Sequence, residues 1–113
     1  MGKEVKVLSS ITSTKLKAAD LIDYQADAVV SKTLIARPSG TVTLFAFDEG
    51  QGLSEHTAPF DALVSIIDGE VEIIISGQPY ILQAGEMIIM PAGEPHALNA
   101  LTQFKMLLTM IKS

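Results

Sequence analysis

The sequence contains no cysteine, which excludes disulfide bonds, thiolate catalysis and cysteine-ligated metals. Positive charge is also scarce, since eight lysine and arginine residues stand against thirteen acidic residues and the net charge at pH 7 is -5. Such a chain offers no basic patch to a nucleic-acid backbone or an anionic membrane, so we expect neither partner. No apolar run approaches membrane-spanning length, and residues 1–6 are polar and lack the apolar core of a signal peptide. We therefore expect a cytoplasmic protein.

Length and composition favour one folded unit. The chain has 113 residues, of which 48% are hydrophobic and 19% are charged. This is enough apolar side chain for a sizeable core, and the length leaves no room for a second domain. We expect residues 1–113 to form a single domain.

Regularly spaced glycines divide the second half of the chain into short segments. They lie eight residues apart, at Gly69, Gly77, Gly85 and Gly93. The segments between them, such as 71–75 and 87–90, are apolar and rich in β-branched residues. Strands of this length between evenly spaced turns are typical of a β-sandwich or β-barrel. Residues 41–47 and 104–111 have the same character and predict two further strands.

The dipeptide Asp68-Gly69 is a two-residue hairpin signal. It predicts a type I′ turn that joins a strand at residues 63–67 to a strand at residues 71–75.

One segment has helical periodicity. Leu16, Ala19 and Ile22 would share a face of a helix over residues 15–23, which allows two turns at most. We expect this short N-terminal helix to cover a barrel edge.

Two predicted strands, at residues 72–76 and 105–111, are apolar on both faces. Only one face of a barrel wall lies inside, so the outer face of these strands needs separate cover. In a chain this short the cover is expected to be a second copy, which predicts a homodimer.

Two stretches together resemble the paired motifs of the cupin family. Residues 50–69 resemble the first motif, G-x5-H-x-H-x3-E-x6-G, and residues 85–96 resemble the second, G-x5-P-x-G-x2-H. The two motifs and the segment between them span residues 50–96. It implies an all-β cupin fold, a double-stranded β-helix or RmlC-like jelly-roll barrel, here with one short N-terminal helix. The second motif region, taken to residue 100, ends where many cupins carry an asparagine; Ala100 stands there, and Asn99 is one place early.

The metal-binding part of the first motif is incomplete. In cupins, two histidines and a glutamate of motif one and a histidine of motif two hold a divalent metal inside the barrel. His56 and His96 match the first and last of these ligands, whereas Ala58 and Ala62 replace the second histidine and the glutamate. The resemblance therefore implies at most one divalent metal ion, with His56 and His96 as its ligands, and no organic cofactor.

Strand alternation turns the motif positions inward. His56 and Ala58 are two residues apart and point to the same side of an extended strand, while alternation turns Glu55 away. The motif frame turns the next strand inward at every second residue and brings His96 in from the opposite sheet. The expected pocket around the histidines is apolar, lined by Ala58, Ala62, Val64, Ile66, Met90 and Leu98, with Phe45 and Met106 as further candidates.

Three interpretations of the histidine pair remain open. The histidines could ligate a metal that solvent, a substrate carboxylate or a nearby protein group completes. They could anchor a small organic ligand, because imidazole both donates and accepts hydrogen bonds. They could also be structural residues in a barrel that performs no chemistry.

The functional hypotheses follow these interpretations. The first is a small-molecule-binding or sensing module with an optional divalent metal, and the catalytic residues remain unknown. The alternative implied by the resemblance is a metal-dependent enzyme of dioxygenase, isomerase or decarboxylase type. A third is an interaction protein with an inert barrel. Fold alone does not choose among them.

Overall fold

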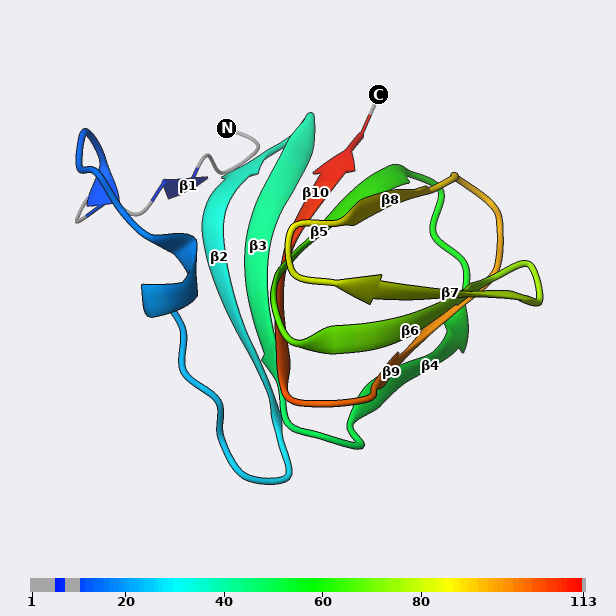
Figure 1. Ribbon diagram of the computed structural model, residues 1–113. Coiled ribbons are helices and arrows are strands. Elements are labelled where there is room, and N and C mark those ends of the chain that lie inside the picture. The colour runs from blue at the N-terminus through cyan, green and yellow to red at the C-terminus, as the bar shows by residue number, and fades with distance from the viewer. Residues whose placement is uncertain (1–5, 8–10, 113) are drawn as a thin grey trace.

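The computed structural model describes residues 6–7 and 11–112, so the polar residues 1–5 lie outside the described part of the chain. Two antiparallel sheets face each other around a shared core (Figure 1). The six-stranded sheet has the order β1-β2-β3-β10-β5-β8, and the four-stranded sheet has the order β4-β9-β6-β7. This is the predicted all-β jelly-roll barrel. Within the described residues, no helix is long and apolar enough to cross a bilayer.

The strands follow the predicted apolar segments closely. In chain order they are β1 (Lys6–Val7), β2 (Val29–Arg37), β3 (Gly40–Phe47), β4 (Gly52–His56), β5 (Asp61–Asp68), β6 (Glu70–Ile75), β7 (Gln78–Gln83), β8 (Met87–Met90), β9 (His96–Ala100) and β10 (Phe104–Ile111). The strands expected at residues 41–47, 87–90 and 104–111 are confirmed as β3, β8 and β10.

Alternating residues from both sheets fill the space between them. The rings of Phe47 and Phe104 stack at 4.5 Å with an interplanar angle of 13°, and neither is exposed to solvent. Val64 of β5 and Ile73 of β6 meet the same cluster from the two opposite sheets. The period-2 pattern of these strands therefore reports the inner face of each sheet correctly.

The hairpin predicted at Asp68-Gly69 is wrong. β5 pairs with β10 and β8 in one sheet, whereas β6 pairs with β7 and β9 in the other, so the chain crosses between sheets at Gly69. The two-residue hairpin turn instead lies at Ser76-Gly77, where both residues have positive φ and Ile75 faces Gln78. An Asp-Gly pair favours positive φ both in a hairpin turn and where the chain crosses between sheets, so the dipeptide alone does not distinguish the two.

The predicted helix over residues 15–23 is present only as a single 3-10 turn, η2 (Ala18–Asp20). Its neighbouring carbonyls bind the sheet: Lys105 Nζ donates to Ala19 O at 2.6 Å and Lys32 Nζ donates to Leu21 O at 3.1 Å. No side chain caps the N-terminus of the turn. Tertiary contacts thus replace the helical hydrogen bonds on which a second turn would depend.

This N-terminal segment covers a sheet face and not the expected barrel edge. Ile22 packs with Leu44 and Ala46 in a second cluster. In Figure 1 the blue turn of residues 18–20 lies beside β2, on the side of the six-stranded sheet that faces away from the other sheet. The Tyr24 hydroxyl donates to the Asp68 carboxylate at 2.6 Å, and Lys105 Nζ lies 4.9 Å from the centre of the Tyr24 ring. The chain itself therefore supplies part of the cover that the apolar outer face of β10 requires.

Candidate functional site

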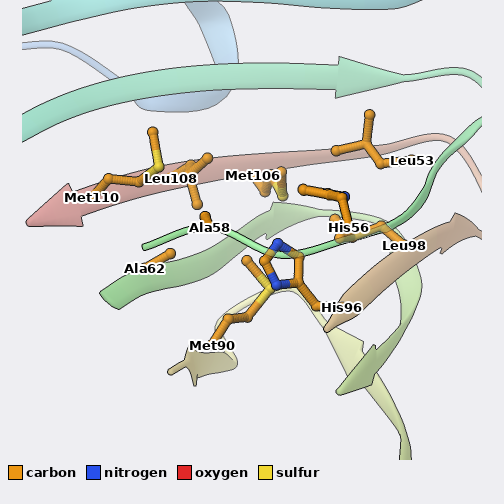
Figure 2. Close-up of a pocket in the computed structure, with 10 residues that line it drawn as sticks. All are labelled: Leu53, His56, Ala58, Ala62, Met90, His96, Leu98, Met106, Leu108 and Met110. Carbon is orange, nitrogen blue, oxygen red and sulfur yellow. The ribbon is translucent and has the colours of Figure 1, made fainter. Parts of the chain in front are cut away.

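His56 and His96 lie directly opposite each other on the neighbouring strands β4 and β9. Their ring centres are 4.3 Å apart and their planes meet at 70°, so the edge of one ring approaches the face of the other (Figure 2). His96 is buried, with 6% of its surface exposed, whereas His56 is exposed at the end of β4. One imidazole therefore belongs to the barrel interior and the other to its mouth.

Backbone and side-chain bonds fix the loop that presents His96. The Ser76 amide donates to Pro95 O at 2.8 Å, and the Ser76 hydroxyl donates to the Glu94 carboxylate. On the other side of the loop, the Gly93 amide donates to Ala58 O at 2.8 Å, which ties the second motif to the first. These contacts anchor the loop on both sides of the barrel opening.

Both histidines are held in the same tautomer by a carbonyl two residues upstream. His56 Nδ1 lies 2.8 Å from Ser54 O, and His96 Nδ1 lies 3.2 Å from Glu94 O. A carbonyl oxygen can only accept, so Nδ1 carries the proton in each ring. In the neutral imidazole each Nε2 then keeps a free lone pair. The pair can accept two hydrogen bonds or donate two lone pairs to a metal.

The pKa of His96 is lower than that of an ordinary histidine. Burial is the main cause, because it disfavours the charged ring; the bond to Glu94 opposes the shift and the nearby charge of His56 adds to it. His96 is therefore a neutral acceptor at pH 7.

A cavity of about 70 Å³ opens beside the two rings (Figure 2). Apart from the histidines, all the side chains that line it are apolar: Leu53, Ala58, Ala62, Met90, Leu98, Met106, Leu108 and Met110. This volume is small beside the roughly 300–1,000 Å³ of pockets that take drug-sized ligands. The cavity suits a compact ligand or a single ion.

The structure brings four of the six predicted pocket residues to this cavity: Ala58, Ala62, Met90 and Leu98. Val64 and Ile66 lie further along β5 in the core and do not line it, and Phe45 packs against the same core. Alternation along β10 places Leu108 and Met110 on the same inner face as Met106, so the sequence pattern was sufficient to find them.

Leu53 was missed because strand alternation fails in β4. The register between β4 and β9 shifts between Leu53 and His56, as in a β-bulge. The irregularity lets two residues three positions apart reach the same cavity. A bulge of this kind leaves no clear mark in the sequence.

The residues present do not fit the four-ligand divalent site of cupins. Among the described residues, no group of three or more histidine, cysteine, aspartate or glutamate side chains could hold a metal ion. Glu55 is exposed, and Asp61 accepts a hydrogen bond from the Ala92 amide at 2.9 Å. Neither carboxylate replaces the missing glutamate.

Comparison with known proteins establishes the family. Residues 43–112 match the cupin domain family, so the chain belongs to the cupins. A conserved protein of unknown function from Streptococcus pyogenes is 34% identical and has a TM-score of 0.89, with 99% of this chain and 96% of that chain covered. A cupin superfamily protein from Desulfitobacterium hafniense is 28% identical, with a TM-score of 0.88 and coverage of 98% and 100%.

A third similar structure is a longer protein. The cupin 2 conserved barrel domain protein from Leptotrichia buccalis is 41% identical, with a TM-score of 0.81; 83% of this chain and 46% of that chain are covered. A comparison with curated proteins found no match. The comparisons thus define the class of barrel and leave its ligand to be argued from the site.

The lowered pKa of His96 predicts how stability changes with pH. The unfolded chain binds a proton near pH 6.5, while the folded chain resists it, so the unfolded state binds more protons below that pH. Stability should be full above about pH 6.5 and should fall as the pH drops towards the lower folded pKa. Urea unfolding in the presence of a chelator should show this loss for the wild type. A His96→Gln variant should lose less over the same range; an equal loss would contradict the assignment.

Proposed function

We propose that the chain is a cupin that binds a compact small molecule through His56 and His96, with an optional metal. The observation that supports this is the imidazole pair at one side of an otherwise apolar cavity, with Nδ1 of each ring bound to a backbone carbonyl. A few convergent polar groups in an apolar cavity are typical of small-molecule sites. We propose further that residues 1–113 act as one such domain.

The tautomers narrow the chemical class of the ligand. The buried His96 is the neutral ring, and its Nε2 accepts a hydrogen bond, so the ligand should present a donor, such as the hydroxyl of a phenol or alcohol. A carboxylate anion beside His96 would face that lone pair, or would require protonation of His96 against its lowered pKa. The apolar wall favours a small ring or branched alkyl group beside that donor.

A thermal-shift series tests this proposal. Phenol and small alcohols should raise the melting temperature of the wild type, because a ligand present at 100 times its dissociation constant stabilises by about 2.7 kcal/mol. A His56→Leu, His96→Leu variant should lose the shift. Gln78→Leu, a polar-to-leucine change at an exposed residue of β7, should keep it. The proposal fails if no compound shifts the wild type or if the double variant responds equally.

The alternative of a divalent-metal enzyme has weaker support. Two imidazoles can supply two ligands to a metal, but catalytic zinc sites usually have three protein ligands. Elemental analysis of protein purified without chelator tests this alternative, because a metal-dependent enzyme should retain roughly stoichiometric divalent metal. Stoichiometric divalent metal that disappears with His56→Leu and His96→Leu would favour the enzyme.

We also propose a homodimer formed by the bare part of the six-stranded sheet. A cross-strand row runs over its outer face through Ile35, Val42, Thr109, Leu63 and Ile89. Ile89 is 61% exposed, and no charged side chain interrupts the row. An uncharged, largely apolar row of this kind suits a second copy of the same surface.

Charge at the ends of the next row favours a second copy. Arg37 on β2 and Asp61 on β5 are the outer members of a row that passes through Gly40 and Ile111. When two such sheets pack face to face about a two-fold axis parallel to the strands, Arg37 lies opposite the partner's Asp61. The two ends of the row thus complement each other.

A charge placed in the row should separate the dimer. Ile89→Glu is expected to give a monomer in sedimentation-velocity experiments at concentrations where the wild type is a dimer, because each copy would bury a carboxylate without a partner in the apolar contact. Ile81→Glu, equally exposed but on β7 of the other sheet, is the matched control and should remain a dimer. A monomeric wild type would refute the proposal.

A further inference from the structure

The histidine pair faces methionines across the cavity. Met90 lies directly opposite Ala62 in the pairing of β8 with β5, so its side chain stands beside the position where cupins carry the glutamate ligand. Met106 and Met110 also line the cavity, which therefore holds three of the five methionines of the chain. In Figure 2, Met110 lies at the end away from the histidines.

The side chains that could donate electron pairs here bear no negative charge, and the sulfurs among them are soft ligands. They are imidazole Nε2 atoms and thioether sulfurs, with no carboxylate or thiolate among the lining residues. A divalent ion would keep its full charge in an apolar cavity, at a high desolvation cost. A monovalent ion has a lower desolvation cost, and copper(I) is a soft monovalent ion that binds thioether and imidazole ligands.

Packing alone gives an incomplete account of these methionines. Leu53, Leu98 and Leu108 line the same cavity, so leucine fits its walls. Flexible methionine fills irregular gaps, yet the position beside the replaced glutamate is where a sulfur ligand would be needed.

From this arrangement we infer that the barrel binds one copper(I) ion through Nε2 of His56 and His96 and the thioether sulfur of Met90, with Met106 as a further sulfur donor. The inference rests on the proposed function, because it assigns the optional metal to the same imidazole pair. Binding takes up copper already in the monovalent state, so no electron is transferred.

Competition with the copper(I) chelator bicinchoninate, in anaerobic buffer with ascorbate, tests the inference. The wild type should withdraw about one copper(I) per chain, and its affinity should fall by tenfold or more in a Met90→Leu, Met106→Leu variant. Met87→Leu, at an exposed methionine outside the cavity, is the matched control and should bind as the wild type does. No withdrawal of copper by the wild type, or unchanged affinity in the double variant, would overturn the inference.

X-ray absorption on the copper-loaded wild type gives an answer that does not depend on how the variants fold. Sulfur scattering in the first shell supports thioether ligation, and a shell of nitrogen and oxygen alone overturns it. The thermal-shift series with phenol separates this inference from the proposed function. Leucine keeps the wall apolar, so Met90→Leu, Met106→Leu should still respond to phenol while losing copper(I). If the wild type binds copper(I) but does not respond to any organic ligand, the proposed small-molecule binding is refuted and the copper(I) inference stands.

Discussion

Replacing Gly69 with alanine should lower the free energy of unfolding by roughly 2–5 kcal/mol. Gly69 has a φ of +76°, a region that costs about 1–2 kcal/mol for a residue with a Cβ atom. A Cβ atom at this position would also overlap the carbonyl of Gln103. Overpacking of this kind adds about 1–3 kcal/mol. Urea unfolding of the purified variant measures the sum.

Gly77→Ala is the matched control for this change. Gly77 has nearly the same φ, +81°, but a Cβ atom there would meet nothing within 4 Å. Its loss should be limited to the conformational cost of about 1–2 kcal/mol. Equal losses in the two variants would show that the contact with Gln103 does not constrain the crossing.

The size of the expected effect follows from the place of Gly69 in the fold. Two crossings between the sheets lie side by side here, one at Gly69 and one at residues 101–103. The amides of Leu101 and Thr102 donate to Glu70 O, and the Glu70 amide donates to the Thr102 hydroxyl. A displaced Gly69 would disturb all three bonds, and with them the packing of one sheet on the other.

The sequence predicted the strands better than their pairing. Spacing of glycines and β-branched runs depends on local conformation, so β3, β8 and β10 could be located from it. Pairing depends on which sheet a strand joins, and nothing local distinguishes the crossing at Asp68-Gly69 from the hairpin at Ser76-Gly77. The N-terminal helix failed for a similar reason, since lysines distant in sequence bind its carbonyls.

In the site, too, the features set by local sequence were predicted and those set by tertiary contacts were not. The motif frame was sufficient to bring His56 and His96 together, because fixed spacing and strand alternation set both positions. The tautomers could not be predicted, because they depend on the carbonyls of Ser54 and Glu94, whose positions relative to the rings are set by the folded structure. Met90 was predicted to line the pocket, but its place directly opposite Ala62 depends on the register between β5 and β8. The sequence alone therefore did not show which ring nitrogens carry protons or which side chains stand next to the histidines.

Restoring the two missing cupin ligands should raise the affinity of the barrel for zinc(II). The double change Ala58→His and Ala62→Glu is expected to raise zinc(II) affinity on the order of 100-fold or more. Four-ligand zinc sites bind with about 10–16 kcal/mol, and each 1.4 kcal/mol is tenfold in affinity. Both alanines line the cavity with the histidines, so the new side chains would start from the same space. Isothermal titration or competition with a zinc indicator measures the gain.

The metal-free double variant should in turn be less stable than the wild type. Ala62 is 4% exposed, and a glutamate there would be buried without a partner until metal arrives. Zinc should therefore raise the melting temperature of this variant far more than that of the wild type. Ala97→His with Ala62→Glu is the control, because alternation along β9 turns residue 97 away from His96 and the cavity. If zinc affinity is the same in both double variants, Ala58 and Ala62 do not converge with the histidines. If the first variant gains zinc and loses preference for copper(I), the restored histidine and carboxylate together decide which ion the barrel accepts; without them, the side chains that can donate electron pairs at the cavity are imidazoles and thioethers.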